Sequence, residues 1–323
     1  MGYLTRLTLA LAAGAGRLPG EVLEGHRAFL LGRQNGDGGW GGREGGSDPY
    51  YTTFALRGLW ISGGVDRAVA VAAGDFLRRQ MSRRMTVVDL MSLIFAAAIL
   101  EIAAGEVVIG EDEHWSDRMV DLMQSMRTED GGFAKTPEGR AGSTYQTFLS
   151  TLCFELLQRP VPEPDRVAAF LDGQRREDGG YLEIRAAKRA GVNPTAAAVG
   201  TLRCIDRFDG DAFAGTADFL LSRQNADGGF SANTRIPFSD LLSTFTGLWT
   251  LVDGGVAPDR SVSKGAGRYA ESMSRLGRGA VDGVKSVDGG GGFVGFEFDE
   301  VTDVEYTFYG LGVMSLVGAL DER

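Results

Sequence analysis

The sequence predicts an all-α protein in which one helical hairpin is repeated to build an inner and an outer ring of helices. Two observations predict it. A phrase of an acidic residue, two glycines and an aromatic recurs along the chain, and segments of helical periodicity flank it, with no segment alternating as a strand would. The copies are RQNGDGGW at 33–40, TEDGGF at 128–133, QRREDGGY at 174–181, RQNADGGF at 223–230 and VDGGGGF at 287–293.

The spacing of these copies predicts six repeats in one domain, 1–323. The second glycines of three copies, Gly132, Gly180 and Gly229, are 48 and 49 residues apart. The 93 residues from Gly39 to Gly132 are close to two periods, so one unit without the loop is expected between them. The repeats are expected near 20–63, 67–105, 112–159, 162–209, 211–255 and 260–320.

The first helix of each repeat is expected to be amphipathic, as at 21–34 and 212–224, and to end at the glycines, which readily adopt the left-handed conformation that terminates helices. The second helix is expected to begin at an Asp or Ser N-cap four residues before a threonine. These caps are Asp48, Ser143, Asp240 and Asp303.

The second helices are apolar on nearly every side, as at 244–252 and 307–318, which is typical of helices buried between layers. They are therefore expected to form the inner ring. The unit without a loop contributes helices near 68–81 and 87–104, which gives twelve helices in six hairpins. The aromatics after the glycines are expected to hold each loop against the outer helices.

The composition excludes several classes of protein. A net charge of −10 argues against nucleic-acid binding. The two cysteines, Cys153 and Cys204, lie in apolar helical patterns and are expected to be buried thiols of a reduced compartment. No run of 18 apolar residues predicts a membrane span, and the apolar segment 4–13 is expected to be the first helix rather than a signal peptide. We expect a cytoplasmic protein.

The repeated phrase, at a spacing near 48 in a hairpin repeat, resembles the prenyltransferase and squalene-cyclase repeat family over residues 20–320. The resemblance implies an α/α toroid around a central apolar cavity, and size and repeat number look most like a protein prenyltransferase β subunit. It implies that the chain is an enzyme that handles isoprenoids. Fold alone does not fix the chemistry, so the family's functional positions are compared one by one.

The zinc site of the family's protein prenyltransferases does not look retained. Its Asp, Cys and His ligands correspond here to Asp240, Leu242 and Tyr306, and a leucine cannot bind zinc. The two histidines, His26 and His114, belong to outer-helix patterns. We therefore expect no zinc and no other cofactor, apart from Mg²⁺ accompanying a diphosphate, and we expect Asp240 to be a helix cap.

The resemblance implies a diphosphate site made of loop cations. Lys188 and Arg189 match the basic residue before the fourth inner helix, and Arg235 matches the cation after a later glycine loop. Arg140 repeats the pattern one unit earlier. Converging guanidinium and ammonium groups would neutralise a diphosphate. The alternative is that these are solvated loop charges.

A second resemblance concerns the acid of squalene-type and other class II cyclases, an Asp-x-Asp-Asp motif at the start of an inner helix. The segment Asp303-Val304-Glu305-Tyr306 has a similar frame, with Glu305 in place of the acid and Tyr306 in place of the last Asp. Glu305 would be the proton donor to an alkene, provided that its surroundings keep it protonated. The alternative is that Asp303 is only a helix cap.

Aromatic residues near the starts of the inner helices are expected to line an isoprenoid tunnel and to stabilise carbocations, although each of them could instead be core. They are Tyr50, Tyr51, Tyr145, Phe148, Phe245, Trp249, Tyr306, Phe308 and Tyr309.

Three functions therefore remain open. The leading one is a prenyltransferase-like enzyme that binds a polyprenyl diphosphate without zinc. The alternatives are a class II-type terpene cyclase that starts from Glu305, and a non-catalytic toroid that binds a lipid or a protein. An α-subunit-like partner would be consistent with the resemblance, but the acidic composition does not indicate one.

Overall fold

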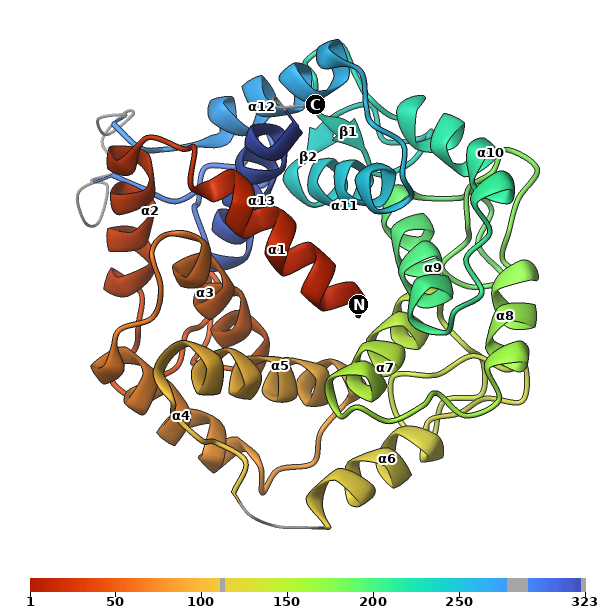
Figure 1. The fold of residues 1–323 in the computed structure, drawn as a ribbon, viewed down its shortest axis with the longest axis horizontal. Coiled ribbons are helices and arrows are strands. Elements are labelled where there is room, and N and C mark those ends of the chain that lie inside the picture. Colours follow the sequence, from red (N-terminus) through yellow and green to blue (C-terminus); the bar gives the residue numbers. More distant parts are fainter. Residues whose placement is uncertain (111–113, 278–289, 321–323) are drawn as a thin grey trace.

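The computed structural model describes residues 1–110, 114–277 and 290–320, which form two concentric rings of helices and a central helix (Figure 1). This confirms the predicted all-α toroid. The inner helices are α3 (Pro49–Ile61), α5 (Val87–Ala104), α7 (Thr144–Leu156), α9 (Val192–Cys204), α11 (Leu241–Asp253) and α13 (Val304–Leu320). The outer helices are α2 (Gly20–Gly32), α4 (Arg67–Gln80), α6 (Trp115–Ser125), α8 (Pro164–Asp172), α10 (Gly210–Leu221) and α12 (Arg260–Met273).

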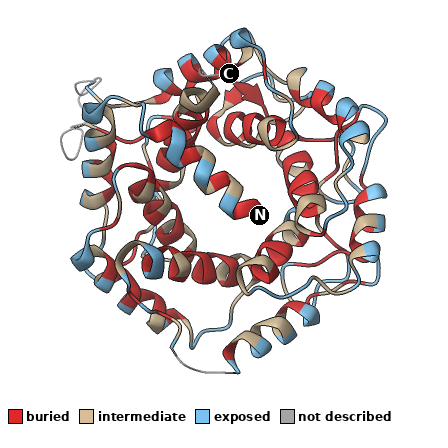
Figure 2. Ribbon diagram, in the orientation of Figure 1, coloured by how far each residue is buried: buried red, intermediate tan, exposed pale blue. Residues whose placement is uncertain are grey.

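The inner ring is closed, because each inner helix packs against the next and α13 packs against α3. Its residues are mostly buried, whereas the outer helices are exposed on their outward sides (Figure 2). This distribution confirms the assignment of the nearly all-apolar helices to the inner ring. Within the described residues, sheet is confined to two short antiparallel strands, β1 (Phe230–Ser231) and β2 (Ser239–Asp240).

The inner helix α5 is the one described helix long and apolar enough to cross a membrane. Most of its residues are buried, and it packs against α3, α4 and α7. Its apolar composition therefore fits a place in the toroid wall.

The predicted caps start their helices as expected. The side chains of Asp48, Ser143 and Asp240 accept hydrogen bonds from the amides three residues later, and Asp303 accepts one from the Tyr306 amide at 2.8 Å. Each such bond satisfies a helix-end amide that would otherwise lack a partner.

The threonine four residues after the cap joins the helix to the glycine loop. In the fourth loop, the Phe230 amide donates to Thr244 Oγ1 at 2.9 Å, and that hydroxyl donates to the Asp240 carbonyl at 2.7 Å. The same pair of bonds recurs at Thr147, Thr195 and Thr307. The threonine therefore fixes the loop on the first turn of the inner helix.

Replacing Thr244 with valine is expected to destabilise the protein by about 1–3 kcal/mol, because the Phe230 amide is left buried without an acceptor. Denaturant unfolding measures the loss. Thr244→Ser keeps the hydroxyl and should lose less. Equal losses in the two variants would contradict the role assigned to the hydroxyl.

The glycines do not end the outer helices, and this prediction was wrong. Helix α2 ends at Gly32, and its C-cap residue Arg33 has right-handed backbone angles. The left-handed residue is Gly38, with φ of 89°, inside the turn. Glycine is needed there because a Cβ would lie 2.1 Å from the Ala72 carbonyl oxygen on α4. The turn thus packs its backbone directly on the next outer helix.

The aromatics that follow the glycines are buried between the two rings. Trp40 is fully buried and its indole Nε1 donates to the Leu30 carbonyl of α2 at 2.7 Å. Phe293 stacks on His26 of the same outer helix, with ring centroids 4.4 Å apart. These contacts confirm that the aromatics hold the loops against outer helices. In the fifth copy of the phrase, residues 287–289 lie outside the described part.

The expected first helix is present as α1 (Tyr3–Ala15), but it belongs to neither ring. It lies across the centre of the toroid and packs mainly on α13 (Figure 1). Glu155, at the end of α7, accepts hydrogen bonds from the amides of Tyr3 and Leu4 at 2.7 and 2.9 Å. Arg6 pairs with Asp253 at the end of α11 at 2.7 Å. Helix α1 therefore closes the end of the ring formed by the carboxyl ends of the inner helices.

Candidate functional site

A cavity of about 390 Å³, here called the barrel cavity, lies inside the inner ring. The residues that line it recur at helical spacing after each N-cap residue, because side chains three or four residues apart lie on the same face of a helix. The second residue after the cap lines the cavity in five inner helices: Tyr50, Val88, Tyr145, Asn193 and Leu242. The sixth residue lines it in all six: Phe54, Ser92, Leu149, Ala197, Thr246 and Tyr309.

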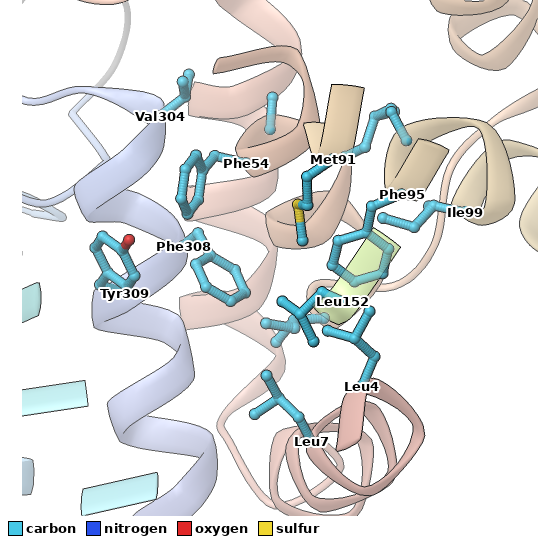
Figure 3. Close-up of a cluster of buried hydrophobic side chains, with 14 of the residues drawn as sticks. Leu4, Leu7, Phe54, Met91, Phe95, Ile99, Leu152, Val304, Phe308 and Tyr309 are labelled. Carbon is cyan, nitrogen blue, oxygen red and sulfur yellow. The ribbon is translucent and has the colours of Figure 1, made fainter. Parts of the chain in front are cut away.

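The cavity is closed at its far end by helix α1. Tyr3, Leu4 and Leu7 of α1 line it together with residues one turn further along the inner helices, such as Phe95 and Leu152. Figure 3 shows Leu4 and Leu7 pointing toward this group of apolar side chains. The cavity is therefore a mainly apolar pocket with its polar groups near the starts of the inner helices and at Arg57.

In the remaining inner helix, α13, the second residue after the cap is Glu305, and it does not itself line the barrel cavity. It lies directly behind the wall. The Tyr50 hydroxyl donates to Glu305 Oε1 at 2.7 Å, Tyr309 forms a second hydrogen bond with it, and both tyrosines line the cavity. Burial raises the pKa of Glu305 to about 7, although the hydrogen bond from Tyr50 acts in the opposite direction. A substantial fraction of this carboxyl is therefore protonated at neutral pH.

Asp303 and Tyr306, the neighbours of Glu305 in the sequence motif, have other partners. Asp303 is buried, caps α13 and accepts a hydrogen bond from Arg43 Nε at 2.8 Å. Arg43 also pairs with Asp299 and stacks on the Tyr306 ring, 5.5 Å from its centroid. Tyr306 packs against Gly295 outside the barrel cavity. The structure thus separates a capping Asp303 from the buried acid Glu305.

Of the predicted aromatics, Tyr50, Tyr145, Phe148, Phe245, Trp249 and Tyr309 line the barrel cavity. Tyr51, Tyr306 and Phe308 lie outside its lining. The helical period explains the difference for the first two, because they stand three residues after their caps, about 100° around the helix from the cavity-facing position. Phe308 lines a second cavity, described below.

The four predicted loop cations, Lys188, Arg189, Arg235 and Arg140, are exposed, and none lines the barrel cavity. They lie in the loops that lead into α7, α9 and α11, on the side where the inner helices begin. Within the described residues their side chains have no acidic partner within ion-pair distance.

Among the lining residues that the sequence reasoning missed, three bear on the chemistry of the site. Glu183 follows the third glycine loop, accepts a hydrogen bond from the Ser143 hydroxyl, and has its pKa raised by burial. Asn193 stands two residues after the glycine cap of α9, and its side chain is polar but uncharged. Arg57 stands nine residues after Asp48. Counting along the helical period from each cap could have found all but Glu183, which lies in a loop.

Arg57 is half-buried, and it lines both the barrel cavity and a second cavity of about 260 Å³, here called the side cavity. Its guanidinium lies 3.8 Å from the Phe308 ring centroid, with Phe54 and Phe95 at 5.4 and 5.2 Å. Burial lowers its pKa to about 10. The three rings are labelled in Figure 3.

The positions that correspond to zinc ligands do not assemble a donor set. Both oxygens of Asp240 accept hydrogen bonds from Ser243, at 2.7 and 2.8 Å, so this carboxylate serves as the predicted cap. Leu242 lines the cavity with an apolar side chain, and Tyr306 points elsewhere. His26 is buried and accepts a hydrogen bond from the Gly292 amide. In the described ranges, no group of three or more His, Cys, Asp or Glu residues is placed to hold a metal ion.

Comparison with protein families gives one assignment. The model of the prenyltransferase alpha-alpha toroid domain matches residues 75–321. A comparison with curated proteins gave no match.

Two solved structures show the same fold. Candida albicans protein geranylgeranyltransferase-I complexed with GGPP is 14% identical, with a TM-score of 0.63 and 91% of each chain covered. A variant of the type II terpene cyclase MstE from Scytonema, in complex with its substrate geranylgeranyl dihydroxybenzoate, is 13% identical, with a TM-score of 0.61. That match covers 99% of this chain and 100% of the cyclase chain.

Proposed function

The chain belongs to the prenyltransferase alpha-alpha toroid family, and we propose that it is an isoprenoid-binding enzyme that starts a cyclisation by protonating a carbon–carbon double bond from Glu305. One observation carries the proposal. A buried carboxyl with a pKa of about 7 lies behind the wall of an apolar cavity and is hydrogen-bonded to two tyrosines of that wall.

The proposed first step transfers a proton to one alkene carbon through the hydroxyl of Tyr50 or Tyr309, which lines the cavity and takes up the carboxyl proton of Glu305 as it gives up its own. The electrons of the π bond form the new C–H bond, and the other alkene carbon becomes a carbocation while Glu305 becomes a carboxylate. The raised pKa keeps the proton available at neutral pH. The hydrogen bond from Tyr50 stabilises the carboxylate that the step leaves behind.

The rings of the cavity support the same chemistry. Phe54 lies 4.9 Å from Tyr50 and 5.3 Å from Tyr309 between ring centroids, and Phe245 lies 5.5 Å from Tyr309. Ring faces attract a cation through their quadrupoles, and they do so more strongly where water is excluded. A carbocation formed beside Glu305 would therefore be stabilised along its path into the cavity.

The relatives of the same fold support an isoprenoid ligand, because one binds GGPP and another binds geranylgeranyl dihydroxybenzoate. The absence of a zinc donor set among the described residues favours proton-initiated chemistry over zinc activation of a thiolate, as far as this chain's own residues are concerned. We therefore propose that the enzyme uses no zinc.

A second candidate is a prenyltransferase-like enzyme that holds a polyprenyl diphosphate by its head group. The observation that favours it is the group of four exposed loop cations, Lys188, Arg189, Arg235 and Arg140, on the side where the inner helices begin. Mg²⁺ would accompany the diphosphate, with the loop cations supplying the remaining neutralising charge.

Thermal-shift measurements with farnesyl and geranylgeranyl diphosphates and with the corresponding alcohols test both candidates. Saturating ligand is expected to raise the Tm by several degrees, because binding to the native state alone stabilises it. No shift with any of the four compounds would exclude an isoprenoid ligand.

The loop cations are tested by Arg189→Ala. If they bind the diphosphate, this variant should lose the part of the shift by which diphosphates exceed alcohols and keep the shift with the alcohols. Arg223→Ala is the control, since Arg223 is a partly buried arginine two residues after the end of α10 and lies outside the cavity lining. An unchanged shift in Arg189→Ala would remove Arg189 from the head-group site.

A further inference from the structure

Arg57 lies inside the toroid and has no acidic partner in the part of the chain that the structure describes. Among the described residues, its guanidinium donates no hydrogen bond to a carboxylate or carbonyl oxygen, and its close partners are the rings of Phe54, Phe95 and Phe308. The exposed part of the side chain faces the two cavities that it lines. Ring faces stabilise the positive charge, but they cannot accept hydrogen bonds from the five N–H groups that lie in the plane of the guanidinium.

The charges around Arg57 are few. Of the described residues that line the barrel cavity, only Arg57 and Glu183 are charged, and of those that line the side cavity, only Arg57 is charged. Glu183 lies near the starts of the inner helices, whereas Arg57 lies beside Leu4 and Leu7 of α1 at the closed end. Retaining an unpaired charge in an apolar pocket is costly, unless a ligand supplies the missing anion.

We propose that Arg57 binds the acidic end of the substrate, so that the ligand is an isoprenoid chain with a terminal carboxylate. This inference rests on the proposed isoprenoid function of the same cavity. A planar guanidinium presents two parallel N–H donors to a carboxylate. A single cation balances a single negative charge, which fits a carboxylate better than a diphosphate with several charges.

The position of Arg57 fits a ligand that also reaches Glu305. The two residues stand nine and two positions after the caps of the adjacent inner helices α3 and α13, which places them about 10 Å apart along the toroid axis. The apolar chain would lie between them in the barrel cavity, with its carboxylate at Arg57 and its far double bond toward Glu305.

The reaction gives a second reason for an anion at this place. A free guanidinium in a pocket of low dielectric would repel the carbocation that forms when the alkene is protonated. A carboxylate paired with Arg57 cancels that repulsion. The ligand would thus bring the charge that makes the cavity compatible with a cationic intermediate.

The test compares farnesoic acid with farnesol by isothermal titration calorimetry at pH 8, where the acid is ionised. The two compounds share the chain and differ at its end. The wild-type protein is expected to bind the acid at least about ten-fold more tightly than the alcohol. In Arg57→Met the ratio should fall to within about two-fold, because the affinity for the acid is lost and that for farnesol is kept.

Arg33→Met is the matched control, since Arg33 stacks on Phe29 with its guanidinium 5.0 Å from the ring centroid but lies outside both cavities. It should keep the wild-type ratio. Equal binding of acid and alcohol by the wild-type protein would overturn the role of Arg57 and leave the isoprenoid function standing, and this result needs no variant to fold. A preference for the acid that persists in Arg57→Met would also overturn it. Binding of neither compound would overturn both proposals.

Discussion

Glu305→Gln is expected to reduce the rate at which the enzyme cyclises a polyprene substrate by about 10²–10⁴-fold, because glutamine cannot donate a proton to an alkene. The variant should bind the substrate as the wild-type protein does, since the glutamine oxygen can still accept the hydrogen bond from Tyr50. Product analysis after incubation with geranylgeranyl and farnesyl compounds measures the loss. Thermal shifts with the same compounds show whether binding is kept.

Glu183→Gln tests which of the two carboxyls near the cavity is the proton donor. Glu183 lines the cavity directly, and its pKa is also raised by burial. If Glu305 is the acid, Glu183→Gln should retain far more turnover than Glu305→Gln. Full turnover in Glu305→Gln would exclude Glu305, and loss in Glu183→Gln alone would transfer the role to Glu183.

The pH dependence of activity should follow the same carboxyl. Its charged neighbours are Asp303, which raises its pKa, and Arg43, which lowers it, while burial remains the largest cause of the shift to about 7. Activity of the wild-type protein should therefore fall as the pH rises through about 7. Stability should change in the same sense, because the folded protein holds a proton that the unfolded chain releases near pH 4.5. Glu305→Gln should flatten that decline in stability between about pH 5 and 8.

The fold was predictable because its signals repeat. The glycine phrase recurs along the chain, and the caps at Asp48, Ser143, Asp240 and Asp303 mark the starts of α3, α7, α11 and α13, where the structure has them. The central position of α1 was not predictable. Its apolar face fits a ring helix equally well, and the contacts that place it, such as Arg6 with Asp253, join residues 247 positions apart.

The candidate site was predictable where it follows the helical register. Tyr50 and Tyr145 stand two residues after their caps, and they line the cavity as expected. Tyr51 is one residue further and lies outside the lining, so a cluster of aromatics in the sequence was too coarse a guide. The sequence also could not show that Arg57 has no acidic partner among the described residues, because this depends on which side chains of other helices surround it.

Gly38→Ala is expected to be among the most destabilising single changes in the toroid, costing roughly 3–5 kcal/mol. Gly38 has a φ of 89°, a conformation that L-residues rarely adopt, and an added Cβ would meet the Ala72 carbonyl oxygen at 2.1 Å. The obstacle is backbone of α4, so it cannot move aside without shifting a helix. Thermal and denaturant unfolding should both show the loss, as a Tm lower by many degrees.

Gly36→Ala is the matched control, because it changes the same turn two residues earlier. No atom lies within 4 Å of the position a Cβ would take at Gly36, and its φ is not positive. The equivalent residue of the fourth copy is already an alanine, Ala226. The variant should therefore unfold within about 1 kcal/mol of the wild-type protein. If Gly38→Ala were as stable as Gly36→Ala, the close approach of this turn to the α4 backbone would not contribute to the stability of the toroid.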